Sequence, residues 1–290
     1  MGDKMEETMF GPSGNGAAFY DAGFKSSVDA PKWLKSIGLN AYEYSFGRGF
    51  SMGFDKAELL GRAGSENDVL ISVHAPYYIN FANPSDEMFE KSLNYVLTSF
   101  EYLRHFGGKH VVVHIGTNGK LSREEALALV RARIPKCVEM LKSHGFGDCK
   151  MCIETMGKYT QIGTYEEIVD LCTMDDMLIP CFDFGHINCI EQGALKTSED
   201  FERILSYAVD KLGYEKVNNC HIHFSKIMFS EKGEIKHLDF DDHFYGPEFE
   251  PLAHALKKLD LHPHIICESA TKMSEDARIM KGIYDSTQIL

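Results

Sequence analysis

Short apolar runs rich in β-branched and aromatic residues alternate with helical patterns along the whole 290-residue chain. This alternation constrains the fold most strongly, because strands that are separated by helices pair in parallel within one sheet. We expect eight strands, at residues 8–12, 41–46, 69–75, 110–115, 150–155, 178–184, 217–224 and 262–268. Eight strand-and-helix units predict a single (β/α)8 TIM barrel. We assign residues 8–290 to this one domain and residues 1–7 to a flexible leader.

Helix signals fall between the predicted strands. Ser85 opens an amphipathic run that continues to Phe106, and Ser122 begins a capping-box pattern with an acidic residue three positions on. Similar patterns begin at Thr164 and Ser198, and glycines at positions 107, 108 and 145 fall where helices should end. No low-complexity linker divides the chain, which favours one domain.

Composition narrows the functional classes. A hydrophobic content of 44% and a charged content of 25% are typical of a globular protein with a large core. The formal net charge of −13 argues against a nucleic-acid binder that relies on a basic surface, but not against a site whose positive charge comes from metal ions. Eight cysteines are too few for a disulfide scaffold in a chain of this length, and no signal-peptide core or membrane-span pattern occurs. We expect a cytoplasmic protein with reduced thiols that does not bind membranes.

Polar residues end the predicted strands. His74, His114, Glu154, Asp183 with His186, His221 with His223, and Glu268 each lie at or just after the end of an apolar run. In a barrel these ends converge on the face where active sites are built. A single histidine at such a position is more often a hydrogen-bonded structural residue than a ligand. Six successive strands with such residues would instead crowd carboxylates and imidazoles together, which metal ions would compensate.

The ligand types narrow the choice of metal. Mixed imidazole and carboxylate ligands suit zinc, manganese or iron, and the lack of cysteine argues against a structural zinc site. Asp241 and His243 form an Asp-x-His pattern on the loop after the seventh strand. We expect them to contribute ligands, the alternative being a solvated acidic loop.

The segments HAPYYIN, VVVHIGT, CIETMGK, FDFGHIN, HIHFSK and ICES follow one another at barrel-unit spacings. In this order they resemble the endonuclease IV family of apurinic/apyrimidinic endonucleases, a branch of the xylose-isomerase-like barrels. The resemblance implies a trinuclear zinc cluster. Its first metal would be held by His74, His114 and a bridging Glu154, its second by Glu154, Asp183, His221 and Glu268, and its third by His186, Asp241 and His243.

The resemblance also implies an activity, which is hydrolysis of the DNA phosphodiester 5′ to an abasic site during DNA repair. Glu154 and Glu268 would be the catalytic carboxylates, with two or three Zn²⁺ per chain or Mn²⁺ in their place. Arg48, Tyr77 and Tyr78 correspond to residues that engage DNA containing abasic sites, and the protein would act as a monomer.

The sequence departs from the family pattern at two places. Phe184 replaces a small residue after the sixth strand, and the seventh-strand pattern has lost an Asn and an Asp, leaving His223 in their place. His223 therefore either supports a neighbouring ligand or substitutes for one.

Two other functional classes remain open. A sugar isomerase or epimerase of the same barrel group needs one divalent ion, for which Glu154, Asp183, His221 and Glu268 would suffice, with the two glutamates moving protons. The acidic surface and the altered seventh strand favour this alternative, whereas the additional pair His74 and His114 favours the nuclease. A barrel that binds a metal or small ligand without catalysis is the third possibility.

Overall fold

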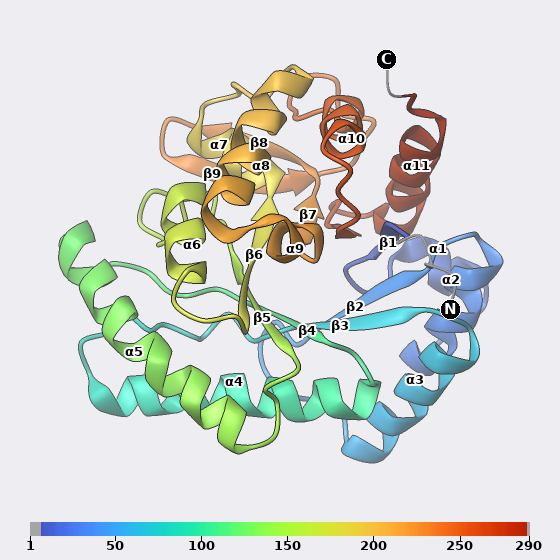
Figure 1. Cartoon of the computed structure of the whole chain (residues 1–290). Helices are drawn as coiled ribbons and strands as arrows, with labels where there is room; N and C mark the ends of the chain where they lie inside the picture. Colours follow the sequence, from blue (N-terminus) through green and yellow to red (C-terminus); the bar gives the residue numbers. More distant parts are fainter. Residues whose placement is uncertain (1–6, 289–290) are drawn as a thin grey trace.

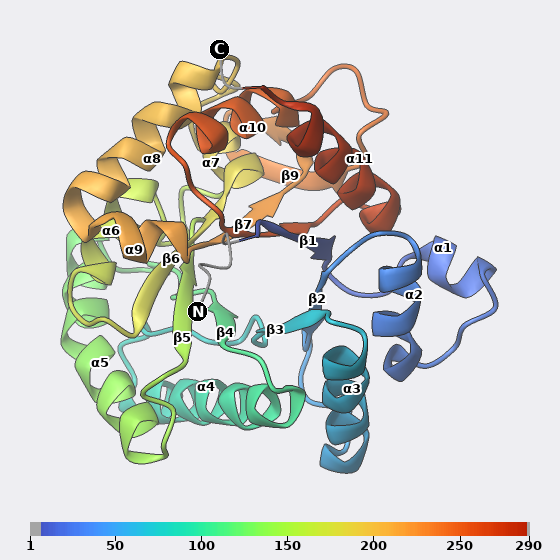
Figure 2. The ribbon, with the colours of Figure 1, turned by 45° about the vertical axis from the view of Figure 1, so that its right-hand side comes forward.

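The computed structural model describes residues 7–288 and contains eight parallel strands arranged around a central axis with helices outside them (Figures 1 and 2). The strands are hydrogen-bonded in the order β1-β10-β7-β6-β5-β4-β3-β2. A parallel bridge between Ser13 and Glu43 joins the two outer strands of this order, β1 and β2. The predicted TIM barrel is therefore confirmed. Six of the seven residues assigned to a leader lie outside the described part of the chain, so that prediction stays open.

The elements alternate along the chain as the sequence pattern predicts. The barrel strands are β1 (Met9–Pro12), β2 (Ala41–Ser45), β3 (Leu70–His74), β4 (His110–Val113), β5 (Lys150–Glu154), β6 (Leu178–Asp183), β7 (His221–Phe224) and β10 (His264–Cys267). The helices are α1 (Ala17–Asp21), α2 (Ala30–Ser36), α3 (Phe54–Glu66), α4 (Asp86–Phe106), α5 (Arg123–Ser143), α6 (Tyr165–Cys172), α7 (Phe184–Ile190), α8 (Ser198–Leu212), α9 (Tyr214–Asn218), α10 (Phe249–Lys258) and α11 (Met273–Ser286), with a 3₁₀ turn at Ser27–Asp29.

The seventh unit differs from the prediction. The strand expected at residues 217–224 begins only at His221, because the short helix α9 occupies the preceding segment. The barrel strand is followed by an antiparallel hairpin, β8 (Lys226–Ser230) and β9 (Gly233–Leu238), which no sequence pattern had indicated. This hairpin lies on the same side of the molecule as α7 (Figure 1).

Local capping explains where the long helices begin and end. The Ser122 and Thr164 side chains form the predicted capping boxes of α5 and α6. The capping box of α8 is formed one residue earlier than expected, by Thr197 with Asp200. Gly107 ends α4 in the left-handed conformation, which costs glycine little because it has no Cβ.

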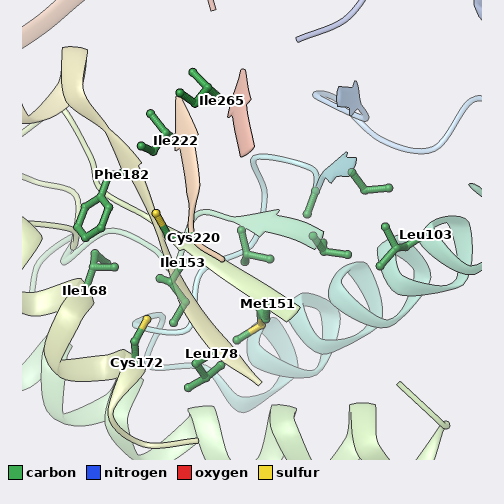
Figure 3. Packing of buried hydrophobic residues seen from close by; sticks show 14 of the residues in the cluster. Leu103, Met151, Ile153, Ile168, Cys172, Leu178, Phe182, Cys220, Ile222 and Ile265 are labelled. Atoms are coloured by element: carbon green, nitrogen blue, oxygen red, sulfur yellow. The ribbon is translucent and has the colours of Figure 1, made fainter. Parts of the chain in front are cut away.

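Strand alternation separates the hydrophobic core from the interior of the barrel. Met151 and Ile153 of β5 and Phe182 of β6 belong to the large buried cluster that packs beneath the helices (Figure 3). The intervening Cys152 belongs to a separate small apolar cluster, which fills part of the barrel interior. Because successive side chains point to opposite faces, every second residue of a strand faces this interior.

Two further observations concern the whole described chain. The eight cysteines are all free and buried. Among the helices of residues 7–288, none combines the length and the apolar character that a bilayer crossing would need.

Candidate metal centre

Glu154 lies at the centre of a group of buried imidazoles at the C-terminal end of the barrel. Its Oε2 atom is 3.2 Å from His74 Nε2 and 2.9 Å from His114 Nε2. Its Oε1 atom is 3.3 Å from His223 Nδ1 and 3.5 Å from His186 Nδ1. These side chains come from the ends of β3 to β7, and Glu154 itself is only 1% exposed. One carboxylate therefore serves imidazoles on both of its oxygens, as a bridging metal ligand does.

Backbone contacts orient two of these rings for metal binding. His74 Nδ1 lies 2.9 Å from the carbonyl oxygen of Ala75, and His186 Nδ1 lies 2.9 Å from that of Thr155. A carbonyl oxygen can only accept, so each Nδ1 carries a proton and donates it. The Nε2 atoms are then left for a metal ion, which is the arrangement that outer hydrogen bonds give to metal-ligating histidines.

Three groups at this end of the barrel bring ligand atoms within 4.8 Å of one another. They are His74, His114 and Glu154; His74, His223 and Glu268; and His186, Glu234 and His237. These sets combine nitrogen and oxygen donors, which suit zinc or manganese. More than one metal-capable group is thus assembled around Glu154.

Asp183 also fits a metal site. Its Oδ1 atom accepts a hydrogen bond from the backbone N–H of His186, at 2.8 Å, and caps α7. Its buried Oδ2 atom has no hydrogen-bond partner among the described residues, although His186 Nδ1 lies 3.2 Å away. A buried carboxylate oxygen without a partner is costly unless a cation compensates it.

Charge interactions within the group shift its pKa values strongly. Burial opposes protonation of His74, but the hydrogen bond and charge of Glu154, with the charges of Glu43 and Glu268, raise its pKa to about 9. Burial likewise opposes ionisation of Glu154, but the charges of His114 and His223 hold its pKa well below the usual range. Burial raises the pKa of Asp183. In the absence of metal, imidazolium ions carry the compensating positive charge.

The two histidines of β7 occupy different depths. His223 contacts Glu154, and its Nδ1 atom lies 3.5 Å from Oε2 of Glu268. The resemblance to the endonuclease IV family had assigned His221 as a ligand beside Asp183 and Glu268. His221 lies two residues deeper in the barrel and contacts Glu43 instead, 3.0 Å away. The structure therefore places His223, for which the sequence left two roles open, where the predicted ligand His221 was expected.

The predicted ligands Asp241 and His243 lie on an exposed loop. The Asp241 carboxylate pairs with Lys272 Nζ at 2.7 Å. The side chains that the structure brings to His186 are instead Glu234, with Oε2 3.6 Å from His186 Nε2, and His237. Both belong to β9 of the hairpin, which sequence analysis did not foresee, and the assignment of Asp241 and His243 as ligands stays a prediction.

Sequence analysis also missed Glu43 of β2. Its carboxylate is fully buried and contacts His223 Nε2 at 3.1 Å. Ser72 Oγ donates to it at 3.2 Å. An acidic residue in the apolar run Ala41–Phe46 was the signal that could have revealed it, because an unpaired buried carboxylate is rare.

The residues expected to engage DNA lie at the rim of this centre. Arg48 is exposed on the loop after β2, and Tyr77 and Tyr78 are 55% and 53% exposed. The Tyr77 ring stacks on the His114 ring, with centroids 5.2 Å apart, while its backbone N–H donates to Gly47. Tyr77 thus connects the rim to the metal-capable group.

Comparison with known proteins places this geometry in a family. Residues 31–283 match the family model described as a xylose isomerase-like TIM barrel. An uncharacterized protein of Methanocaldococcus jannaschii is 30% identical over 248 residues, which cover 86% of this chain and 88% of the relative. A probable endonuclease 4 of Staphylococcus epidermidis is 32% identical over 180 residues, covering 59% of this chain and 57% of that protein.

Solved structures show the same barrel. The 3-keto-D-glucoside 4-epimerase of E. coli superposes with a TM-score of 0.68 at 15% identity, covering 96% of this chain and all of that one (100%). Endonuclease IV of Thermus thermophilus superposes with a TM-score of 0.64 at 17% identity, covering 96% and 98%. At such identities the likeness concerns the fold alone. By the family match over residues 31–283, the chain belongs to the xylose isomerase-like TIM barrel family.

Proposed function

We propose that this protein is a zinc-dependent phosphodiesterase that hydrolyses the phosphodiester 5′ to an abasic site in DNA. One observation carries the proposal: two imidazoles, His74 and His114, face the same oxygen of Glu154 in addition to the ligands that a single-metal site would use. The similarity to a probable endonuclease 4 supports the same activity.

The residues present fit a cluster of up to three ions. His74, His114 and Glu154 would hold the first ion, and Glu154, Asp183, His223 and Glu268 the second. His186, Glu234 and His237 would hold the third. When bound, zinc supplies Lewis-acid stabilisation of phosphoryl oxygens and lowers the pKa of water, and manganese could act similarly.

The protein side chains then have distinct tasks. Glu154 contacts imidazoles through both of its carboxylate oxygens and would thereby hold the ligands of two ions at a fixed separation. Glu268 has a side chain that is 16% exposed, in contrast to the buried Glu154 and Asp183. It therefore lies nearest to solvent and is best placed to orient the attacking water. Tyr77, stacked on His114, closes one side of the centre and restricts access to the reacting phosphate.

Binding of DNA would depend on the rim. Extruding an abasic nucleotide leaves a gap that Tyr77, Tyr78 and Arg48 would fill, and the unstacking cost of a few kcal/mol is smallest at damaged sites. With a net charge of −13, attraction for intact DNA should be weak. Cleavage is therefore expected to be confined to abasic duplex.

The test incubates zinc-loaded protein with a duplex that carries one tetrahydrofuran abasic analogue, which resists lyase chemistry. Incision 5′ to the analogue that is lost in His114→Ala and weakened in Tyr78→Ala would support the proposal. His144→Gln, on the exposed end of α5, is the matched control and should cleave normally. Absence of incision by the zinc-loaded wild type would contradict it.

A metal-dependent sugar isomerase or epimerase is the second candidate. Its specific support is that Glu154, Asp183, His223 and Glu268 form a set sufficient for one ion, and that sugar epimerases are among the structural neighbours. In that reaction Glu154 and Glu268 would move protons beside a carbonyl carbon. Metal-dependent interconversion of ketoses without incision of abasic duplex would favour it.

A further inference from the structure

Three buried histidines meet at the opposite, N-terminal end of the barrel. His110 opens β4, His221 opens β7 and His264 opens β10. His221 and His264 are register partners on neighbouring strands, whereas β6 and β5 separate β7 from β4 in the sheet. Each strand contributes an inward-facing residue at the same level, so the three rings gather near the barrel axis. The proposed function uses none of their ring atoms.

The ring nitrogens of this N-terminal histidine cluster (His110, His221 and His264) have the spacing of a metal site. One nitrogen from each ring lies within 4.8 Å of the others. His110 Nδ1 and His221 Nδ1 are 3.4 Å apart. Two ligands on a tetrahedral zinc ion with Zn–N distances near 2.05 Å lie about 3.3 Å apart. The His110 and His221 nitrogens therefore already have the separation of two ligands on one ion. The His264 ring, which stacks on the His110 ring with centroids 4.4 Å apart, would complete the set.

Glu43 prepares His221 for this role from the other side of its ring. His221 Nε2 lies 3.0 Å from Glu43 Oε2, although the direction of the contact falls short of a good hydrogen bond. The negative oxygen still favours the proton on Nε2. The lone pair is then left on Nδ1, which faces His110. A carboxylate behind a ligating histidine is the usual outer support of a zinc ligand.

The surroundings offer an entry path and neutral ligands. A cavity of about 350 Å³ is lined by all three histidines, and Lys109 and Lys150 also line it. Both lysines are engaged elsewhere, Lys109 with Asp148 and Lys150 with the carbonyl of Asp176. Burial lowers the pKa of His264 to about 3, so that its ring offers a lone pair at neutral pH.

We propose that the N-terminal histidine cluster binds one zinc-class transition-metal ion through three imidazoles, with the fourth position open to the cavity. The ion would tie together β4, β7 and β10. Its role would be structural, since the cavity lies at the end of the barrel opposite the candidate metal centre. This inference does not depend on the proposed function.

The experiment measures zinc by elemental analysis after chelator treatment, reloading with ZnCl₂ and gel filtration. His110→Gln and His264→Gln should each contain one equivalent less than the wild type. The exposed His144→Gln should match the wild type. The melting temperature of the wild type should rise more on reloading than that of His264→Gln.

Wild-type zinc content in folded His110→Gln and His264→Gln would overturn the proposal, leaving a hydrogen-bonded cluster of neutral histidines. If neither variant folds, anomalous diffraction at the zinc edge from zinc-loaded wild-type crystals decides. A peak among the three rings supports the site, and no peak there overturns it. Because each arm reads metal rather than catalysis, failure of the proposed nuclease activity would not affect the result.

Discussion

Replacing Glu43 by glutamine should weaken binding of the metal ion that His223 would hold through Nδ1, the ring nitrogen that faces away from Glu43. Glu43 is fully buried, and its oxygens lie 3.1 and 3.3 Å from His223 Nε2. His223 Nδ1 faces Glu154 and Glu268. A carboxylate on Nε2 fixes the ring so that Nδ1 is offered to an ion, and glutamine would remove the charge while keeping the shape.

The size of the effect follows from these contacts. Removing the outer partner of a metal ligand typically costs 10- to 100-fold in affinity, or about 1.4 to 2.7 kcal/mol. A charge-assisted hydrogen bond contributes about 1.5 to 3 kcal/mol to stability. One kcal/mol shifts the melting temperature of a chain somewhat shorter than this one by roughly 2 to 4 °C. Glu43→Gln should therefore melt roughly 3 to 12 °C lower.

The assay titrates zinc into protein that a chelator has freed of metal, in competition with a chromophoric chelator. Glu43→Gln should bind zinc 10- to 100-fold more weakly at the site that His223 serves. The comparison is made in the His110→Gln background, which lacks the N-terminal site, so that the contact of Glu43 with His221 does not contribute. Ser72→Ala removes only the hydroxyl that donates to Glu43 at 3.2 Å and should change this affinity little. Unchanged zinc affinity in Glu43→Gln would refute the reasoning that Glu43 orients His223.

Three further changes test the centre. Glu154→Gln should lose metal and activity together, whereas His105→Ala, on α4, should keep both. Full metal content in Glu154→Gln, measured by elemental analysis, would exclude the bridging role. In chelator-treated protein, the stability that His74 contributes is complete below its unfolded pKa of about 6.5 and is lost as pH rises through its folded pKa of about 9. Urea unfolding should therefore show about 3 kcal/mol less stability from His74 at pH 9.5 than at pH 6. His74→Gln should show a smaller decrease than the wild type, because the raised pKa values of His186 and His223 act in the same direction. Gly157→Ala would place a Cβ 2.8 Å from Cδ2 of His186 and should cost the metal equivalent held there, with unchanged zinc content as the contrary result.

The fold could be predicted from the sequence because the signals for strands and helices are local. Hydrophobic periodicity located all eight barrel strands, and the capping residues Ser122 and Thr164 marked helix starts, since both features depend on neighbouring residues only. The strand expected to begin at Val217 was placed too early. Val217 is apolar because it packs into the hydrophobic core from the short helix α9, not because it belongs to a strand.

The candidate site could be predicted from the sequence only in part, because it depends on how deep in the barrel each side chain lies. His221 and His223 share one strand face, so alternation makes both point inward but cannot say which one lies level with Glu154. The level depends on how far each strand is staggered along the barrel, which is set by pairing between distant segments. Glu43 was missed because its partners come from β7, far away in the sequence.

The hairpin that carries Glu234 and His237 suggests how reaction classes can diverge on this barrel. The barrel strands provide Glu154, Asp183 and His223, and these ligands depend on positions that the core cannot easily change. The hairpin lies outside the barrel sheet and packs against α7, and Glu234 N donates a hydrogen bond to Gly157 O at 2.8 Å. Exchange of side chains on this segment would alter the number of metal positions while the ligands on the barrel strands stay in place. Chemistry and folding are thereby free to evolve on separate pieces of one polypeptide.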